Sequence, residues 1–220
     1  MHLNLPPTSP DFASKASWRR ELRSARRSLV DEQGETGRDH QSRELTKALL
    51  TWLEPYAERL GRADLSGWSM TAFTAMASEP PTDHLIATLL DRGVRVWLPV
   101  TLPDSQLGWT PAGQTPQGQA RPSPMRPDPA AAQTGAGREA LEQVDVALVP
   151  ALAVSHDGGR LGQGGGYYDR VIPSLRQRHV PVVAVLHDHE WLPQVPRATH
   201  DAAVDAVLTT AGVRVLTPPG

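Results

Sequence analysis

The spacing of apolar residues changes along this chain, and each spacing predicts a different kind of element. Between residues 14 and 29, apolar side chains recur every three or four positions, as they do on one face of an α-helix. The same spacing returns between residues 45 and 60, and Gly61 provides a natural helix end. Gly34 and Gly37 interrupt the pattern between these stretches. We therefore expect two amphipathic helices, the first starting between residues 14 and 17, where serines suit an N-cap.

From residue 68 onward, short apolar runs typical of buried strands alternate with helical stretches. The runs cover residues 68–76, 94–98, 144–149, 181–187 and 204–209. A helix starting at Thr82 or Asp83 separates the first two runs, and Pro99 stops the second. Strand–helix–strand units of this kind pair in parallel with right-handed crossovers. The sequence therefore predicts the α/β class, with a mostly parallel sheet covered by helices on both faces in a Rossmann-like three-layer single domain.

Two segments differ in composition from the rest of the chain. Residues 1–11 contain three prolines and little that can be buried, which indicates a loose N-terminal arm. Residues 103–137 hold seven prolines and five glycines, which predicts a long loop with one short strand near 107–110. A short helix is expected near 138–143. We therefore expect one α/β domain over residues 12–216, interrupted by this loop.

Composition narrows the classes of protein that fit. The 220 residues include 22 Lys and Arg against 24 Asp and Glu, and a net charge of −2 does not favour a nucleic-acid binder. The chain has no cysteine, which excludes disulfides, thiolate zinc sites and cysteine nucleophiles. No apolar run approaches the roughly 18 residues of a membrane span, and the first residues do not resemble a signal peptide. We expect a cytoplasmic monomer that binds neither nucleic acid nor membrane.

The most informative segment is a glycine-rich stretch between a buried strand and a helix. Glycines at positions 162, 164, 165 and 166 leave backbone N–H groups open beside a helix N-terminus, which favours an anion such as phosphate. Tyr167 and Tyr168 stand where a Walker A loop has Lys-Ser/Thr, so that nucleotide motif does not fit. Arg160 can pair with a phosphate, and Asp169 can cap the helix or hold magnesium. A flexible turn with a surface salt bridge is the alternative.

The polar face of the first expected helix is strongly basic. Lys15 and Arg19 lie four residues apart, so they share a helix face and can present two positive charges to a phosphate. A solvated basic surface is the alternative for the whole group, which comprises Lys15, Arg19, Arg20, Arg23, Arg26 and Arg27.

Two other groups of polar residues suggest chemistry at first sight. His187 and His189 share one face of a strand, but no third ligand follows at a fixed spacing, so we expect hydrogen bonds at the strand end rather than zinc. The neighbours 155–157 read Ser-His-Asp, but adjacent residues cannot chain their side chains in the order that a catalytic triad needs.

Five segments resemble the 5-formyltetrahydrofolate cyclo-ligase family, also called methenyltetrahydrofolate synthetases, and they occur in the family's order. The strongest is RLGQGGGYYD at residues 160–169, which resembles the family's RLGxGGGYYD segment. The others are KASWR at 15–19, AMASE at 75–79, VPALAV at 149–154, and VP followed by HDAAVD between 195 and 205. The resemblance spans about residues 15–210.

The resemblance implies an ATP- and Mg²⁺-dependent reaction on a reduced folate. In that family, ATP phosphorylates the formyl oxygen of 5-formyltetrahydrofolate, the neighbouring nitrogen attacks the activated carbon, and 5,10-methenyltetrahydrofolate forms with ADP and phosphate. It implies that Lys15, Arg19 and Arg160 are catalytic and that Asp169 and Asp201 hold the metal. The implied ATP contacts are those three basic residues with Leu161, Gly162, Gln163, Gly164, Gly165, Gly166, Tyr167 and Tyr168. The implied folate contacts are Arg19, Glu79, Gln163, Gly164, Gly165, Gly166 and Tyr167.

Some of these positions have a plainer interpretation, and one departs from the family. Glu79 can cap the helix that starts near Thr82, and Asp201 is otherwise only an acid near a strand. Where the family's long loop usually carries Ile/Leu-x-Glu/Gln-Pro, this chain reads PMRP at 124–127, so Arg126 replaces an acid or amide near the folate. A sugar-phosphate isomerase or a non-catalytic folate-binding module on the same frame are the alternative functions. Tight binding of ATP argues against the isomerase. Formation of ADP together with the methenyl product argues against the non-catalytic module.

Overall fold

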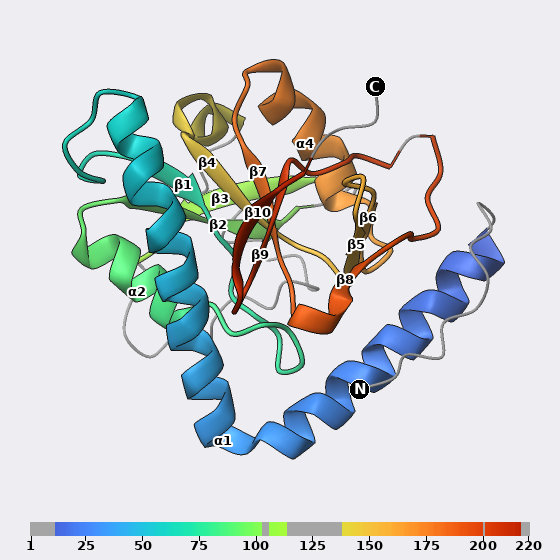
Figure 1. The fold of residues 1–220 in the computed structure, drawn as a ribbon. Coiled ribbons are helices and arrows are strands. Elements are labelled where there is room, and N and C mark those ends of the chain that lie inside the picture. The colour runs from blue at the N-terminus through green and yellow to red at the C-terminus, as the bar shows by residue number, and fades with distance from the viewer. Residues whose placement is uncertain (1–11, 103–105, 114–137, 200, 217–220) are drawn as a thin grey trace.

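A central seven-stranded sheet organises the computed structural model, which describes residues 12–102, 106–113, 138–199 and 201–216. The strand order is β10-β9-β7-β4-β1-β2-β3. The bounds are β1 Ser69–Thr71, β2 Arg95–Thr101, β3 Leu107–Pro111, β4 Val146–Pro150, β7 Val182–Val185, β9 Ala206–Thr209 and β10 Gly212–Val215. Strands β9, β7, β4, β1 and β2 pair in parallel, and β10 and β3 are antiparallel edge strands. The predicted α/β class with a mostly parallel sheet is confirmed (Figure 1).

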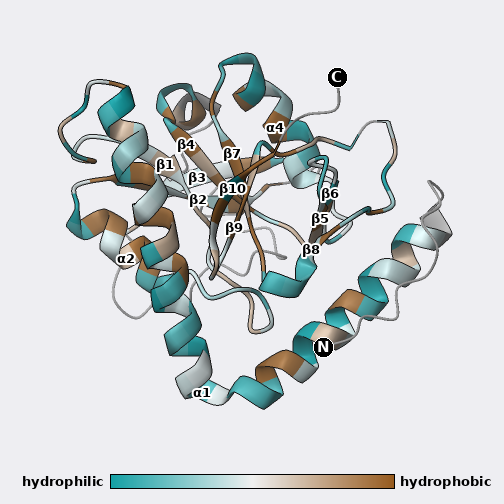
Figure 2. Cartoon of the chain, in the orientation of Figure 1, coloured by the Kyte–Doolittle hydropathy of each residue, from teal (hydrophilic) through white to brown (hydrophobic). Residues whose placement is uncertain are grey.

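Helices cover both faces of this sheet because the side chains of each strand alternate between two cores. Val146 and Leu148 of β4 belong to the core under α2 and the second half of α1, whereas Ala147 and Val149 belong to the core under α4. Figure 2 shows the strands as mostly hydrophobic and α1 as largely hydrophilic on its outer side. The helical bounds are α1 Phe12–Arg59, α2 Asp83–Asp91, α4 Tyr167–Gln177 and the 3₁₀ turns η2 Arg138–Gln143 and η3 Asp188–Glu190. The three-layer prediction is therefore confirmed.

Helix α1 consists of two helices that meet at a kink, which confirms the expected pair of helices. It runs over 48 residues from Phe12, and only Gly34 interrupts it, with φ 61° and ψ −170°. Such a positive φ is readily available to glycine and costly for other residues, so the chain turns sharply there. Gly37, the other expected break, stays helical. Figure 1 shows the two halves of α1 running in clearly different directions from this bend.

A second, small sheet supports the first half of α1. Its strand order is β6-β5-β8, with bounds β5 Ala153–Ser155, β6 Arg160–Leu161 and β8 Trp191–Leu192. Trp18 and Leu22 of α1 pack there against Leu152 and Leu161 in a cluster that is separate from the two main cores. The basic half of α1 is thereby held beside the glycine-rich segment that follows β6.

Several element ends differ from the sequence expectations. Strand β1 covers only Ser69–Thr71 of the apolar run 68–76, although the backbone N–H of Ala72 still donates to the carbonyl of Trp97 in β2 at 2.9 Å. Strand β2 continues through Pro99, because beyond Trp97 it pairs only with the antiparallel β3, where Pro99 faces Trp109. The expected strand near 107–110 is confirmed as β3, and the expected helix near 138–143 is the 3₁₀ turn η2. The predicted arm over 1–11, most of the loop 103–137 and Arg126 lie outside the described residues.

Candidate active site

One cavity brings together side chains from distant parts of the chain. It has a volume of about 600 Å³ and lies at the carboxyl ends of β1, β2 and β4, where open α/β sheets bind ligands. Every site residue that the sequence predicted lines it: Lys15, Arg19, Glu79, Arg160, Leu161, Gly162, Gln163, Gly164, Gly165, Gly166, Tyr167, Tyr168, Asp169 and Asp201. The structure therefore places the start of α1, the glycine loop and the segment around residue 201 at one site.

The glycine loop connects β6 to α4 with a backbone that only small residues permit. Gly164 and Gly166 have φ of 110° and 68°, and Gly166 is the N-cap of α4. A Cβ on Gly165 would come within 2.6 Å of the Tyr167 ring. Gly164 and Gly165 are exposed, so their backbone is accessible at the N-terminus of α4, where the helix dipole favours an anion.

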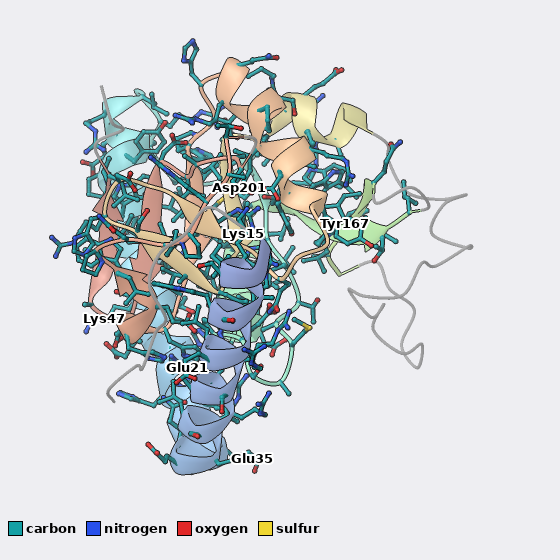
Figure 3. The ribbon with its side chains drawn as sticks, turned by 90° about the vertical axis from the view of Figure 1, so that its right-hand side faces the viewer. Lys15, Glu21, Glu35, Lys47, Tyr167 and Asp201 are labelled. Carbon is teal, nitrogen blue, oxygen red and sulfur yellow. The ribbon has the colours of Figure 1, made fainter. Side chains whose placement is uncertain are left out.

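Lys15 and Asp201 form an ion pair across the cavity wall. The Lys15 ammonium donates to Asp201 Oδ2, and the two side chains are only 6% and 11% exposed. The same oxygen accepts a hydrogen bond from the backbone N–H of Ala198 at 2.5 Å. Figure 3 shows the two side chains together at the N-terminal end of α1, with Tyr167 at the start of α4 nearby. The alternative of a fully solvated basic face is wrong for Lys15.

Arg160 and Asp169 form the second ion pair of the cavity. Arg160 Nη2 donates to Asp169 Oδ1 at 2.6 Å, and the arginine side chain is 4% exposed. Asp169 also accepts from the backbone N–H of Ala202 at 3.4 Å, which brings it next to the segment that carries Asp201. Two cations and two carboxylates thus converge at the mouth of the glycine loop.

Two further arginines of α1 contact the glycine loop directly. Arg19 Nε donates to the carbonyl of Gly162 at 2.9 Å. Arg23 donates from Nε to Gln163 Oε1 at 3.0 Å and from Nη2 to the Gln163 carbonyl at 2.8 Å. Burial, with Arg23 as the next cause, lowers the pKa of Arg19. Such a concentration of positive charge favours a polyanionic ligand.

Glu79 and Gln163 form a polar wall of the cavity away from the two ion pairs. Gln163 Nε2 donates to Glu79 Oε1 at 3.4 Å, and the backbone N–H of Met76 donates to Glu79 Oε2 at 3.0 Å. Glu79 does not cap α2, because its carboxylate bonds within the loop before that helix. Thr82 is the N-cap position, but its hydroxyl donates to the carbonyl of Phe73 instead of to the helix.

The two adjacent tyrosines play different structural parts. The Tyr167 ring lies against Gly165, whereas Tyr168 packs against the core under α4. The Tyr168 hydroxyl is buried and has no hydrogen-bond partner among the described residues. Burial, together with the charge of Glu79, raises the pKa of Tyr168, so its hydroxyl remains a proton donor. Tyr168 is one of the residues that line the cavity.

Comparison with known proteins agrees with this geometry. A model of the 5-formyltetrahydrofolate cyclo-ligase family matches residues 11–210. The chain belongs to that family. It is 34% identical over 172 residues to the 5-formyltetrahydrofolate cyclo-ligase of Mycolicibacterium smegmatis, a match that covers 70% of this chain and 85% of the relative. It is 33% identical over 73 residues to the cyclo-ligase of Escherichia coli strain K12, covering 33% of this chain and 40% of that protein.

Solved structures show the same fold. The 5,10-methenyltetrahydrofolate synthetase of Mycoplasma pneumoniae superposes with a TM-score of 0.65 at 18% identity, over 89% of this chain and 98% of that one. The NMR structure of the Aquifex aeolicus 5,10-methenyltetrahydrofolate synthetase gives 0.61 at 21% identity, over 94% of each chain. The predicted family is therefore confirmed, and the chain is an enzyme of the cyclo-ligase family.

The structure adds cavity residues that sequence reasoning missed. An apolar wall is formed by side chains that follow β1 or lie on β2 and β3, namely Phe73, Met76, Leu98, Pro99 and Leu107. Their apolar character signalled burial but not a ligand site, because their meeting depends on which strands are neighbours. Arg26, interpreted with the basic helix face, is instead fully buried and ion-paired with Glu190.

The remaining polar candidates have structural roles in this member of the cyclo-ligase family. His187 is buried, with Gln41 on Nδ1 and the Ser78 carbonyl on Nε2, which are the hydrogen bonds expected at the end of its strand. Ser155 donates directly to Asp157, bypassing His156, whose ring lies against Trp191. Within the described ranges there is no group of three or more His, Cys, Asp or Glu suited to a metal, and no helix there could cross a membrane.

Proposed function

We propose that the chain catalyses the ATP-dependent cyclisation of 5-formyltetrahydrofolate to 5,10-methenyltetrahydrofolate, with ADP and phosphate as the other products. The observation that carries the proposal is the convergence of three basic side chains, two carboxylates and an open glycine loop on one cavity. Membership of the cyclo-ligase family supports the same reaction.

The basic end of the cavity suits the polyphosphate of ATP. Lys15, Arg19 and Arg160 line it beside the N-terminus of α4, where exposed N–H groups and the helix dipole attract phosphate oxygens. Phosphoryl transfer needs positioning and neutralisation of the charge on the moving group rather than a covalent enzyme intermediate. We assign these tasks to the three basic residues.

The polar and apolar walls suit the folate. Phe73 and Leu98 offer apolar contacts to flat rings, and Glu79 and Gln163 offer hydrogen-bonding groups beside them. Arg19 contacts the loop between the two ends, so it borders both proposed ligands. In this proposal the formyl group therefore binds close to the γ-phosphate.

In the proposed reaction, the formyl oxygen takes the γ-phosphoryl group of ATP, the bond from that phosphorus to the bridging oxygen breaks, and ADP leaves. The neighbouring folate nitrogen then attacks the formyl carbon and loses its proton, and the carbon–oxygen bond to phosphate breaks as the ring closes. The protein holds the formyl oxygen in line with the phosphorus and excludes water from the activated group.

Asp169 and Asp201 fit the role of magnesium ligands in this proposal. Mg²⁺ binds through one or two carboxylates together with substrate phosphates, so two acids beside the phosphate end of the cavity are sufficient. When bound, the ion neutralises phosphate charge and orients the oxygens for transfer. Lys15 and Arg160 hold these two carboxylates in place at that end of the cavity.

The near-ultraviolet absorbance of the methenyl product tests the proposal. We expect it to rise when protein, ATP, Mg²⁺ and 5-formyltetrahydrofolate are mixed, with one ADP formed per methenyl group, and to stay flat when ADP replaces ATP. Folded protein that produces no methenyl absorbance contradicts the proposal. Folate binding without ADP formation would instead indicate a non-catalytic binding module.

A further inference from the structure

Arg26 is a fully buried arginine that lies just behind the cavity wall. Its Nε and Nη2 donate to the two carboxylate oxygens of Glu190 at 2.6 and 2.9 Å. Its Nη2 also donates to the carbonyl of Ala151 at 2.5 Å. Burial by itself lowers the pKa of Arg26, but the Glu190 carboxylate outweighs burial and the pKa is raised. The guanidinium therefore stays charged and is fixed in one orientation.

This orientation points the third nitrogen of Arg26 toward Glu79. Arg26 Nη1 lies 3.9 Å from Glu79 Oε1 and has no hydrogen-bond partner among the described residues. Glu79 lines the cavity although it is only 4% exposed. A carboxylate this well buried is costly unless charged or hydrogen-bonding groups surround it. Arg38 is the other cation in contact with Glu79, but it donates to the Glu79 carbonyl and not to the carboxylate.

A second arginine of the same helix orients the neighbour of Glu79. Gln163 accepts from Arg23 through Oε1 and donates to Glu79 through Nε2. A cation on one side and a carboxylate on the other allow only this orientation of the amide. The Glu79 carboxylate therefore also fixes the orientation of the Gln163 side-chain amide at the cavity.

We propose that Arg26 is a positioning residue for the folate side of the site: it holds the Glu79 carboxylate aimed into the cavity, with Glu190 holding Arg26 in place. The inference rests on the proposed function, because it concerns how that function's folate is recognised. It makes the ATP end of the cavity independent of Arg26, since Lys15, Arg19 and Arg160 do not contact it in the described structure.

The double variant Arg26→Met/Glu190→Gln tests this assignment. It removes both buried charges together, so neither is left unpaired, and the glutamine can still accept from the backbone N–H of His187. We expect the KM for 5-formyltetrahydrofolate to rise about tenfold or more, the effect of losing a charged hydrogen-bonding group. The KM for ATP should change by less than about twofold, because the phosphate contacts are untouched.

Two comparisons separate positioning from general destabilisation. Arg27→Gln removes an exposed arginine one position along the same helix and should leave both KM values unchanged. Glu79→Gln should raise the folate KM by less in the double variant than in the wild-type protein, because Arg26 acts through that carboxylate. An equal rise in the two backgrounds, or equal rises for folate and ATP in the double variant, overturns the assignment.

Arg26→Lys keeps the inference testable if the double variant does not fold. A lysine retains the charge but cannot bridge Glu190 and reach Glu79 at once, so the folate KM should still rise severalfold while the ATP KM holds. Unchanged folate KM in a folded Arg26→Lys protein overturns the inference. Absence of methenyl formation by the wild-type protein would reject the proposed function itself, which distinguishes the two failures.

Discussion

Lys15 forms an ion pair with Asp201, 186 positions further along the chain. One residue belongs to the first turn of α1 and the other to the segment before β9, so neither is near the glycine loop in sequence. Both residues nevertheless line the same cavity as the glycine loop. The charge at the phosphate end therefore depends on how the first and last parts of the described chain come together.

Replacing Lys15 by methionine should weaken ATP binding and catalysis. The loss of a charged phosphate contact costs about 1.5–3 kcal/mol, or roughly ten- to a hundredfold in kcat/KM. Steady-state kinetics and the ATP-induced rise in melting temperature measure both effects. Lys47→Met removes an exposed lysine from the same helix and serves as the matched control, with wild-type values expected. Equal losses in the two variants would refute the role of Lys15.

Gly165→Ala should disturb the site without unfolding the protein. The new Cβ would lie within 2.6 Å of the Tyr167 ring, so the ring must move away from its place in the cavity. Moving a residue of the site by about 1 Å lowers turnover by about ten- to a hundredfold. The melting temperature should remain close to that of the wild type, because Gly165 is exposed. Wild-type kinetics with a folded variant would show that the position of this ring does not matter.

Tyr168→Phe should separate stability from ligand binding. The Tyr168 hydroxyl is buried without a partner among the described residues, so its removal should leave the unliganded protein as stable or up to about 1 kcal/mol more stable. Binding of ATP, measured by calorimetry, should weaken, because Tyr168 lines the cavity and the change removes its polar group. A destabilised variant with unchanged ATP affinity would contradict both parts.

The buried His187 makes the free energy of unfolding depend on pH. Burial lowers the pKa of His187 from its ordinary value of 6.5, so below that pH the unfolded chain binds a proton that the folded chain does not. The free energy of unfolding therefore falls as the pH drops from about neutral through 6.5 toward the folded-state pKa. His187→Gln should make this fall shallower in thermal melts. His189 has a pKa shift of the same sign, so part of the slope should remain.

The exposed His40→Gln is the control for that series and should retain the wild-type slope. If His187→Gln also retains the full slope, the pH dependence arises elsewhere.

The sequence predicts the main sheet well because its strands are buried on both faces. Val146 and Leu148 serve one core and Ala147 and Val149 the other, so the run is apolar throughout and easily found. Strands β5, β6 and β8 escape such reasoning because two or three residues are too few to establish a period. Their pairing depends on neighbours that only the folded chain supplies.

The same contrast holds for the site. The glycine loop and Lys15 were accessible to sequence reasoning through short motifs whose residue types match phosphate chemistry. Arg26 was not, because its partner Glu190 lies 164 positions away and an arginine on a basic helix face is ordinarily solvated. Phe73 and Leu98 were recognised as apolar, but their convergence on a ligand requires knowing that β1 and β2 are adjacent.

Gly34 determines where the first half of α1 ends up. At 1.5 Å per residue, a straight continuation of the helix would carry Lys15 about 28 Å beyond Gly34, away from the sheet. The single dihedral pair of φ 61° and ψ −170° turns that length back along the small sheet instead. A residue with a Cβ is strained in this conformation. Replacing Gly34 therefore changes the direction of the first half of α1, and with it the position of the Lys15 ammonium group that contacts Asp201.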